Sequence, residues 1–212
     1  MLVYRARDIS EEIGRDHPWT HSVQNPEWRY YDFRLQPELI PLVLEDFKEL
    51  SNQPAVQRFY RLLEWMNGPN SCLESSDCGL LIPEDNPDIQ FSNRRRILAR
   101  LMVLFRREDI NHHEKYSNWL LGCFAFHVNR NEPTFTLGAV ELARFPTFFV
   151  RQNAYGYILQ MKFFAYGDTD GEAMGNLGRL FAGTHTAALE VNRQVRESNL
   201  CPVKLGDSQA KT

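Results

Sequence analysis

The sequence has no uninterrupted apolar run of the roughly 18 residues that a membrane-spanning helix requires. Its first residues, 1–17, also lack the apolar core and the small-residue cleavage site of a secretory signal peptide. We therefore expect no membrane partner and a cytoplasmic location.

Positive charge is not in excess either. The chain has 24 Lys and Arg residues against 27 Asp and Glu residues, which gives a formal net charge of −3. Domains that bind nucleic acid are usually basic, so the composition disfavours nucleic acid as a partner. The arginines between positions 94 and 107 form the basic cluster of the chain, and no exposed aromatic residues are interleaved with them. Ion pairing with neighbouring acids is the first use we expect for this cluster, and contact with a small anionic ligand is the second.

Cysteine is scarce, and the four residues, at positions 72, 78, 123 and 201, match no zinc-binding pattern. Cys72 and Cys78 lie in one segment and can pair in an oxidising compartment, but without an export signal we expect reduced thiols. His17 and His21 have the spacing of helical metal ligands, yet Pro18 lies between them. The sequence therefore predicts no metal and no cofactor.

Catalytic motifs are missing as well. No nucleophile has a general base at a diagnostic spacing, and no acid–base pair stands out. Catalytic partners can nevertheless be distant in sequence, so this pattern does not decide whether the protein is an enzyme. The catalytic residues, if the protein has any, stay unknown at this level.

The clearest pattern in the chain is a long strand followed by a long helix, within residues 154–197. Alternate positions from Tyr155 to Ala165 are apolar, which predicts a strand with one face in the core. Thr169 and Glu172 have the spacing of a capping box at the start of the helix. The helix then carries an apolar stripe that predicts one buried face.

A second stripe on this helix consists of small residues. Each glycine inside a helix costs about 0.5–1 kcal/mol relative to alanine, so the stripe needs a structural reason. Close packing within the fold or across a dimer is the reason we favour, and a ligand groove is the alternative. The stripe comprises Gly171, Gly175, Gly178 and Ala182.

Weaker patterns predict the remaining elements. A short strand is expected at 28–35, and two helices are expected to form a hairpin, the first from Glu38 or Pro41 to Leu50 and the second after an Asn52 cap to Asn67. Residues 94–107 fit a strand and a helix equally well, and their context favours the strand. A helix capped by Asn111 should follow, and then two strands, Thr134–Arg144 and Phe145–Val150, separated at Pro146.

This order predicts one α+β domain over residues 1–197, with a mainly antiparallel sheet of about four to five strands and helices on one face. It resembles in order a ferredoxin-like sandwich with an N-terminal helical hairpin and an inserted loop at 69–92. Residues 1–27 are expected to form an irregular N-terminal arm, and residues 198–212 a flexible tail.

Two functions from different classes are compatible with these patterns. The first is a small-molecule-binding protein or cofactor-independent enzyme, whose pocket between the sheet and the 69–92 loop would take a small anionic or aromatic ligand. The second is a protein-interaction or assembly module that uses the exposed sheet face or the glycine stripe. With either function, we expect that the chain can form a homodimer. The residues that we expect to converge on the pocket are Asp77, Arg96, Arg100, His127 and Tyr155.

Overall fold

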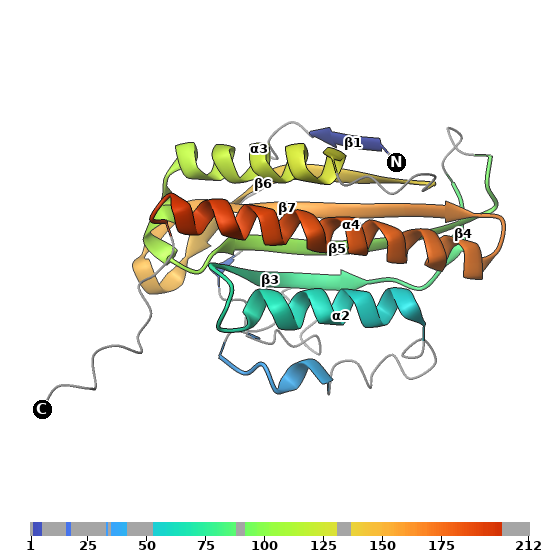
Figure 1. Ribbon diagram of the computed structural model, residues 1–212, viewed down its shortest axis with the longest axis horizontal. Coiled ribbons are helices and arrows are strands. Elements are labelled where there is room, and N and C mark those ends of the chain that lie inside the picture. Colours follow the sequence, from blue (N-terminus) through green and yellow to red (C-terminus); the bar gives the residue numbers. More distant parts are fainter. Residues whose placement is uncertain are drawn as a thin grey trace, which may run out of the picture.

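One sheet runs through the part of the chain that the computed structural model describes, residues 2–5, 16–17, 33, 35–41, 53–87, 92–130 and 137–200. Its seven strands have the order β1-β6-β7-β5-β3, with β2 beside β6 and β4 beside β5 (Figure 1). All neighbours are antiparallel except β1 and β2, which run parallel to β6. The predicted mainly antiparallel α+β architecture is therefore confirmed. The strands are β1 Leu2–Arg5, β2 Asp16–His17, β3 Leu73–Leu80, β4 Glu84–Asp85, β5 Arg95–Phe105, β6 Gly138–Phe149 and β7 Ala154–Gly167.

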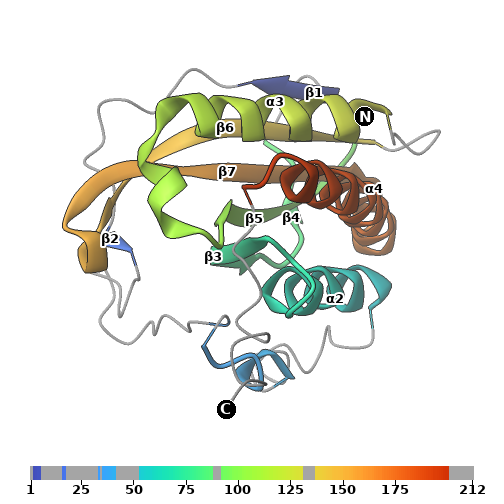
Figure 2. The same cartoon turned by 60° about the vertical axis from the view of Figure 1, so that its left-hand side comes forward.

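Three helices cover the same face of this sheet (Figures 1 and 2). They are α2 (Pro54–Asn67), α3 (Glu114–Arg130) and α4 (Asp170–Glu197), and two short 3₁₀ helices occupy Glu108–His112 and Val150–Gln152. The main core lies between these helices and the sheet. In this core the ring centroid of Phe181 on α4 lies 4.9 Å from the ring centroid of Phe59 on α2. It lies 5.1 Å from the ring centroid of Phe163 on β7.

The predicted strand and helix at 154–197 are present as β7 and α4. Thr169 caps the helix, because its Oγ1 accepts a hydrogen bond from the Glu172 N–H at 3.2 Å. The Glu172 carboxylate reaches back one residue further than predicted and accepts from the Asp168 N–H at 2.8 Å. The cap therefore satisfies two backbone donors at the start of α4.

The stretch 69–92, predicted to be a long loop, contains two strands. Strand β3 pairs with β5 and lies at one end of the described strand order. Its sequence, LESSDCGL, is polar and its register shifts between Ser75 and Cys78, so no simple alternation marks it as a strand. Asn67, at the end of α2, anchors it by donating to Ser75 Oγ at 2.8 Å and accepting from Ser75 N at 3.2 Å.

Strand β6 runs without a break through Pro146, where the sequence predicts two separate strands. Pro146 pairs with Tyr157 of β7. On its other side β1 pairs with β6 only at residues 139–142, and β2 only at 148–149. No described strand therefore needs a hydrogen bond from Pro146 on that side, and the missing N–H is tolerated.

The ambiguous segment 94–107 is a strand, β5, as its context indicates. Asn111 does not cap α3, which begins at Glu114. Instead its buried side chain accepts from Phe105 N at 3.0 Å and donates to Phe105 O at 2.9 Å, so it completes the hydrogen bonding at the end of β5. An amide can replace a neighbouring strand in this way because it carries both a donor and an acceptor.

Other predictions near the N-terminus are corrected or lie outside the described residues. Residues 1–27 were expected to be irregular, yet the described pieces of this arm, β1 and β2, pair with β6. Helix α2 starts at Pro54 with Gln53 as its N-cap, one residue after the predicted Asn52. Most of the predicted strand 28–35, the helix beyond Pro41 and residues 201–212 lie outside the described ranges.

The cysteines also differ from the prediction. Cys72 is disulfide-bonded, whereas Cys78 and Cys123 carry free thiols. The pairing of Cys72 with Cys78 is therefore wrong, and so is the expectation that Cys72 is reduced. Burial raises the pKa of Cys123, which suits an unreactive thiol.

Candidate functional site

The face of the sheet opposite the three helices, called the second face here, carries a row of three charged residues. Arg100 on β5 pairs directly with Lys162 on β7, and Lys162 pairs directly with Glu141 on β6. The residues next to them in sequence, including Leu101 and Met161, belong to the core under the helices. Because side chains alternate along a strand, Arg100, Lys162 and Glu141 point to the second face. We call these three residues the charged row.

The charged row places two cations side by side. Side chains directly opposite each other on antiparallel strands have Cβ atoms about 4.5–5.5 Å apart, and like charges at that spacing repel. Glu141 Oε1 lies 3.9 Å from Lys162 Nζ and offsets part of this repulsion. The row therefore brings two cations and one carboxylate side by side on the second face.

Two features next to the row leave room and polarity for a ligand. Gly79 of β3 pairs with Arg100, and a Cβ atom built on Gly79 would meet no atom of the described residues within 4 Å. Gln160, two residues before Lys162 on the same face, has an exposed fraction of only 4%. Its Oε1 has no hydrogen-bond partner in the described part of the chain. The row is also reachable from solvent, because the Lys162 side chain is 39% exposed.

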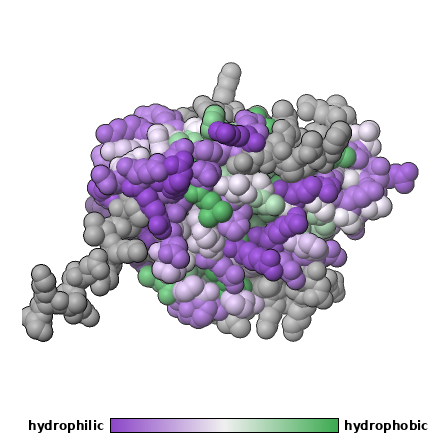
Figure 3. Space-filling view, in the orientation of Figure 1, coloured by the Kyte–Doolittle hydropathy of each residue, from purple (hydrophilic) through white to green (hydrophobic). Residues whose placement is uncertain are grey.

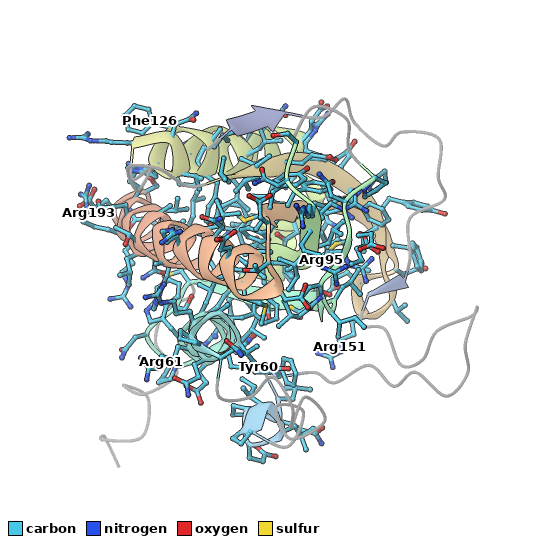
Figure 4. The ribbon with its side chains drawn as sticks, turned by 90° about the vertical axis from the view of Figure 1, so that its right-hand side faces the viewer. Tyr60, Arg61, Arg95, Phe126, Arg151 and Arg193 are labelled. Carbon is cyan, nitrogen blue, oxygen red and sulfur yellow. The ribbon has the colours of Figure 1, made fainter. Side chains whose placement is uncertain are left out.

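Arg96 lies on the same face, four residues before Arg100, but an acid of β4 neutralises it. Its guanidinium donates to Glu84 Oε1 from Nη2 at 2.5 Å and from Nε at 3.1 Å. Its neighbour Arg95 bonds Asp85 and Asp170 near the start of α4 (Figure 4), and the hydrogen bond with Asp170 raises the pKa of Arg95. The expected ion pairing thus accounts for this part of the arginine cluster.

The structure does not bring the five predicted site residues together. Arg96 and Arg100 share the second face. His127 lies on the helix side, buried on α3, with Nε2 at 3.0 Å from the amide nitrogen of Gln194 on α4. Tyr155 is 73% exposed and lies seven residues before Lys162, which is about 23 Å along a strand. The Asp77 side chain lies outside the described residues.

Lys162, Glu141 and Gln160 were missed as site residues. Lys162 and Gln160 stand on the mixed face of the predicted strand at 155–165, which is a signal for a partly polar surface. Their significance depends on Arg100 being directly opposite Lys162. That register is a long-range property, because Arg100 and Lys162 are separated by α3 and β6.

A groove between α2 and α4 involves the glycine stripe. Its volume is about 170 Å³, below the roughly 300–1,000 Å³ of small-molecule pockets. At Gly178 the two helices are in close contact, since an added Cβ would lie 3.3 Å from Ala55 Cα. The predicted close packing therefore holds at Gly178. The groove is lined by Gln53, Pro54, Ala55, Arg58, Gly171, Met174, Gly175 and Gly178.

Two of the three glycines that line this groove, Gly175 and Gly178, should respond differently to substitution. Gly175→Ala is expected to raise the free energy of unfolding by about 0.5–1 kcal/mol, because a Cβ there meets no described residue within 4 Å and alanine favours helix. Gly178→Val is expected to lower it by about 1–3 kcal/mol, because its side chain must displace α2. Urea denaturation measures both, and equal effects at the two positions would contradict the packing described here.

One histidine of α4 has a shifted pKa. His185 of α4 lies against Trp65 of α2, with ring centroids 5.4 Å apart. Burial lowers the pKa of His185, because the charged imidazolium loses solvation there. Within the described ranges, no three His, Cys, Asp or Glu side chains are grouped as metal ligands. His185 therefore takes part in helix packing.

The surface on the helix side is mainly hydrophilic, and its apolar patches are small and scattered (Figure 3). Arg61 on α2 and Arg193 on α4 extend outward into solvent (Figure 4). None of the described helices has the length and apolar character needed to cross a membrane. The described residues on this side form no broad apolar area of the kind that marks a stable protein interface.

Comparison of the chain with protein-family models, with curated proteins and with solved structures finds no match.

Proposed function

We propose that the protein binds a small anionic ligand on the second face of its sheet, between Arg100 and Lys162. The observation that carries this proposal is the direct cross-strand pairing of these two cations. A carboxylate or phosphate oxygen between them would accept charge-assisted hydrogen bonds from both. The open space beside Gly79 supports the proposal, because a ligand needs room next to Arg100.

The proposal is one of binding. Arg100, Lys162 and Gln160 can hold and orient an anion, but none of them is a nucleophile with a base beside it. The alternative function, an assembly module, stays a prediction, and so does the homodimer. The hydrophilic surface over the helices gives them no support on that side (Figure 3).

We also propose that the sheet is a rearranged ferredoxin-like sandwich. The strand order β6-β7-β5-β3 supports this, and so does α3, which connects β5 to β6 in the chain. The difference is the edge strand β3, which precedes β5 in the chain and does not follow α4. Such an analogy says little about function. A cytoplasmic location also stays a prediction, and the disulfide bond of Cys72 weighs against a reducing compartment.

Removing one cation of the row tests the proposed site. In Lys162→Met the affinity for inorganic phosphate or for a simple carboxylate is expected to fall about tenfold, because a charge-assisted hydrogen bond is lost. NMR titration of the full chain measures this directly.

The matched control is Arg61→Met on the outer face of α2, which removes one positive charge elsewhere (Figure 4). Its affinity for both anions should equal that of the unsubstituted protein. If the two variants weaken binding equally, the anion is attracted by overall charge and the charged row is not a site.

A further inference from the structure

We infer that Cys72 forms its disulfide bond with Cys201, and that this bond is a redox-sensitive lock that holds the end of α4 against the start of β3. The chain has four cysteines, at positions 72, 78, 123 and 201. Cys72 is disulfide-bonded, whereas Cys78 and Cys123 carry free thiols. Within one chain, Cys201 is therefore the remaining partner. It lies outside the described ranges, directly after Leu200.

A cysteine of another molecule suits Cys72 less well, because Cys72 is buried. Its exposed fraction is 0%, and it belongs to the main core under the helices. A disulfide bond requires the two Cα atoms to approach within about 7 Å of each other. A second molecule reaches that distance only if the core around Cys72 opens, whereas a cysteine of the same chain can meet Cys72 while the core forms.

The residues before β3 are bonded to the last turns of α4. The Asn192 side chain accepts a hydrogen bond from Cys72 N at 2.7 Å and donates one to Asn70 O at 3.2 Å. Arg196, one turn later on the helix, also donates to Asn70 O. These bonds place Cys72 beside the final part of α4, which ends at Glu197.

The chain turns back at the end of α4. Asn199 has a left-handed backbone with φ of 56°, and the N–H of Leu200 donates to Val195 O at 3.1 Å. This is the Schellman arrangement, in which a left-handed residue reverses the chain after a helix. Leu200 then packs against the main core. Val195 lies about 4.5 Å along the helix axis from the residue that bonds Cys72 N, so Cys201 follows within reach of a disulfide bond.

The proposed bond joins two residues that are far apart in sequence. A disulfide that closes a long loop removes more chain entropy from the unfolded state than one that closes a short loop. A dithiol reduces the bond by giving it two electrons and two protons. The dithiol becomes a cyclic disulfide, and thiols remain at Cys72 and Cys201. The end of α4 then loses its covalent link to β3 and opens more readily, so the stability of the protein follows the redox state of its compartment.

The test begins with mass spectrometry of the full chain digested without reductant, which should show the peptides of Cys72 and Cys201 linked. Dithiothreitol should lower the midpoint of thermal unfolding by about 5–10 °C and speed hydrogen exchange at Leu200 N about tenfold. Cys201→Ser should have the lower midpoint without reductant and should not respond to it. Cys123→Ser, which removes a free thiol, is the matched control and should keep the whole shift.

Three results would overturn the inference. In the first, Cys72 is linked to a second copy of the chain, and a non-reducing gel shows a covalent dimer. In the second, Cys72 is a free thiol, or dithiothreitol shifts Cys201→Ser as much as the unsubstituted protein. In the third, the two peptides are linked but reduction changes neither the unfolding midpoint nor exchange at Leu200, so the bond is not a lock.

Discussion

Phe181→Ala is expected to lower the free energy of unfolding by about 3–5 kcal/mol. Phe181 is fully buried and joins three elements, because its ring contacts Phe59 of α2 and Phe163 of β7 from its place on α4. Alanine leaves a cavity that neither the sheet nor a neighbouring helix can fill without moving. Chemical denaturation with far-ultraviolet circular dichroism measures the loss.

Phe126→Ala provides the matched control for this substitution. Phe126 lies on α3 with 58% of its surface exposed, and its side chain points away from the core (Figure 4). We expect it to change the free energy of unfolding by no more than about 0.5 kcal/mol. A loss at Phe126 as large as that at Phe181 would contradict the arrangement of the core.

Asn111→Leu is expected to lower the free energy of unfolding by about 2–4 kcal/mol. Leucine has a similar volume but cannot replace the two hydrogen bonds from the Asn111 side chain to Phe105 N and Phe105 O. Both backbone groups belong to a residue that is 1% exposed, so water does not replace the amide without cost. The variant should also speed hydrogen exchange at Phe105 N.

Asn118→Leu is the control for Asn111→Leu, since Asn118 is exposed on α3. Its free energy of unfolding should stay within about 0.5 kcal/mol of the unsubstituted protein. If Asn111→Leu proves equally mild and leaves exchange at Phe105 unchanged, the end of β5 is held by other contacts.

The sequence correctly predicted the elements in which the spacing of apolar residues is uninterrupted. β7 alternates without a break over its apolar face, and α4 combines a capping box with a long apolar stripe, so local signals and tertiary packing agree. β5 was predicted to be a strand only because the segment that follows it, α3, has a clear helical pattern. In these segments the residues that face the core are the ones that set the pattern.

The missed elements are held by contacts between residues that are distant in sequence. Strand β3 has a polar sequence and a register shift, and it forms by pairing with β5 and by bonding to Asn67. Asn111 precedes a helix as a cap would, yet its partner is Phe105 in the strand before it. In both cases tertiary pairing outweighed the local preference.

Of the candidate site, the sequence indicated the arginines but not their partners. Arg96 and Arg100 were expected in one site, and both point to the second face of the sheet. Lys162 and Glu141 join the row only through the register of β5, β7 and β6, which composition and spacing do not define. His127 was also expected to converge on this site, and it lies instead on the helix side, next to Gln194 of α4.

The hairpin of β6 and β7 has a consequence for how the chain reaches this structure. All 12 residues of β6 pair with β7 across a turn that ends at Asn153, whose backbone is left-handed with φ of 48°. Closing this short turn loses little chain entropy, whereas β5 must close roughly fifty residues to meet β7. We therefore expect the hairpin to form early as a template on which β5 docks later, so that the two cations of the row come into register only at that late step.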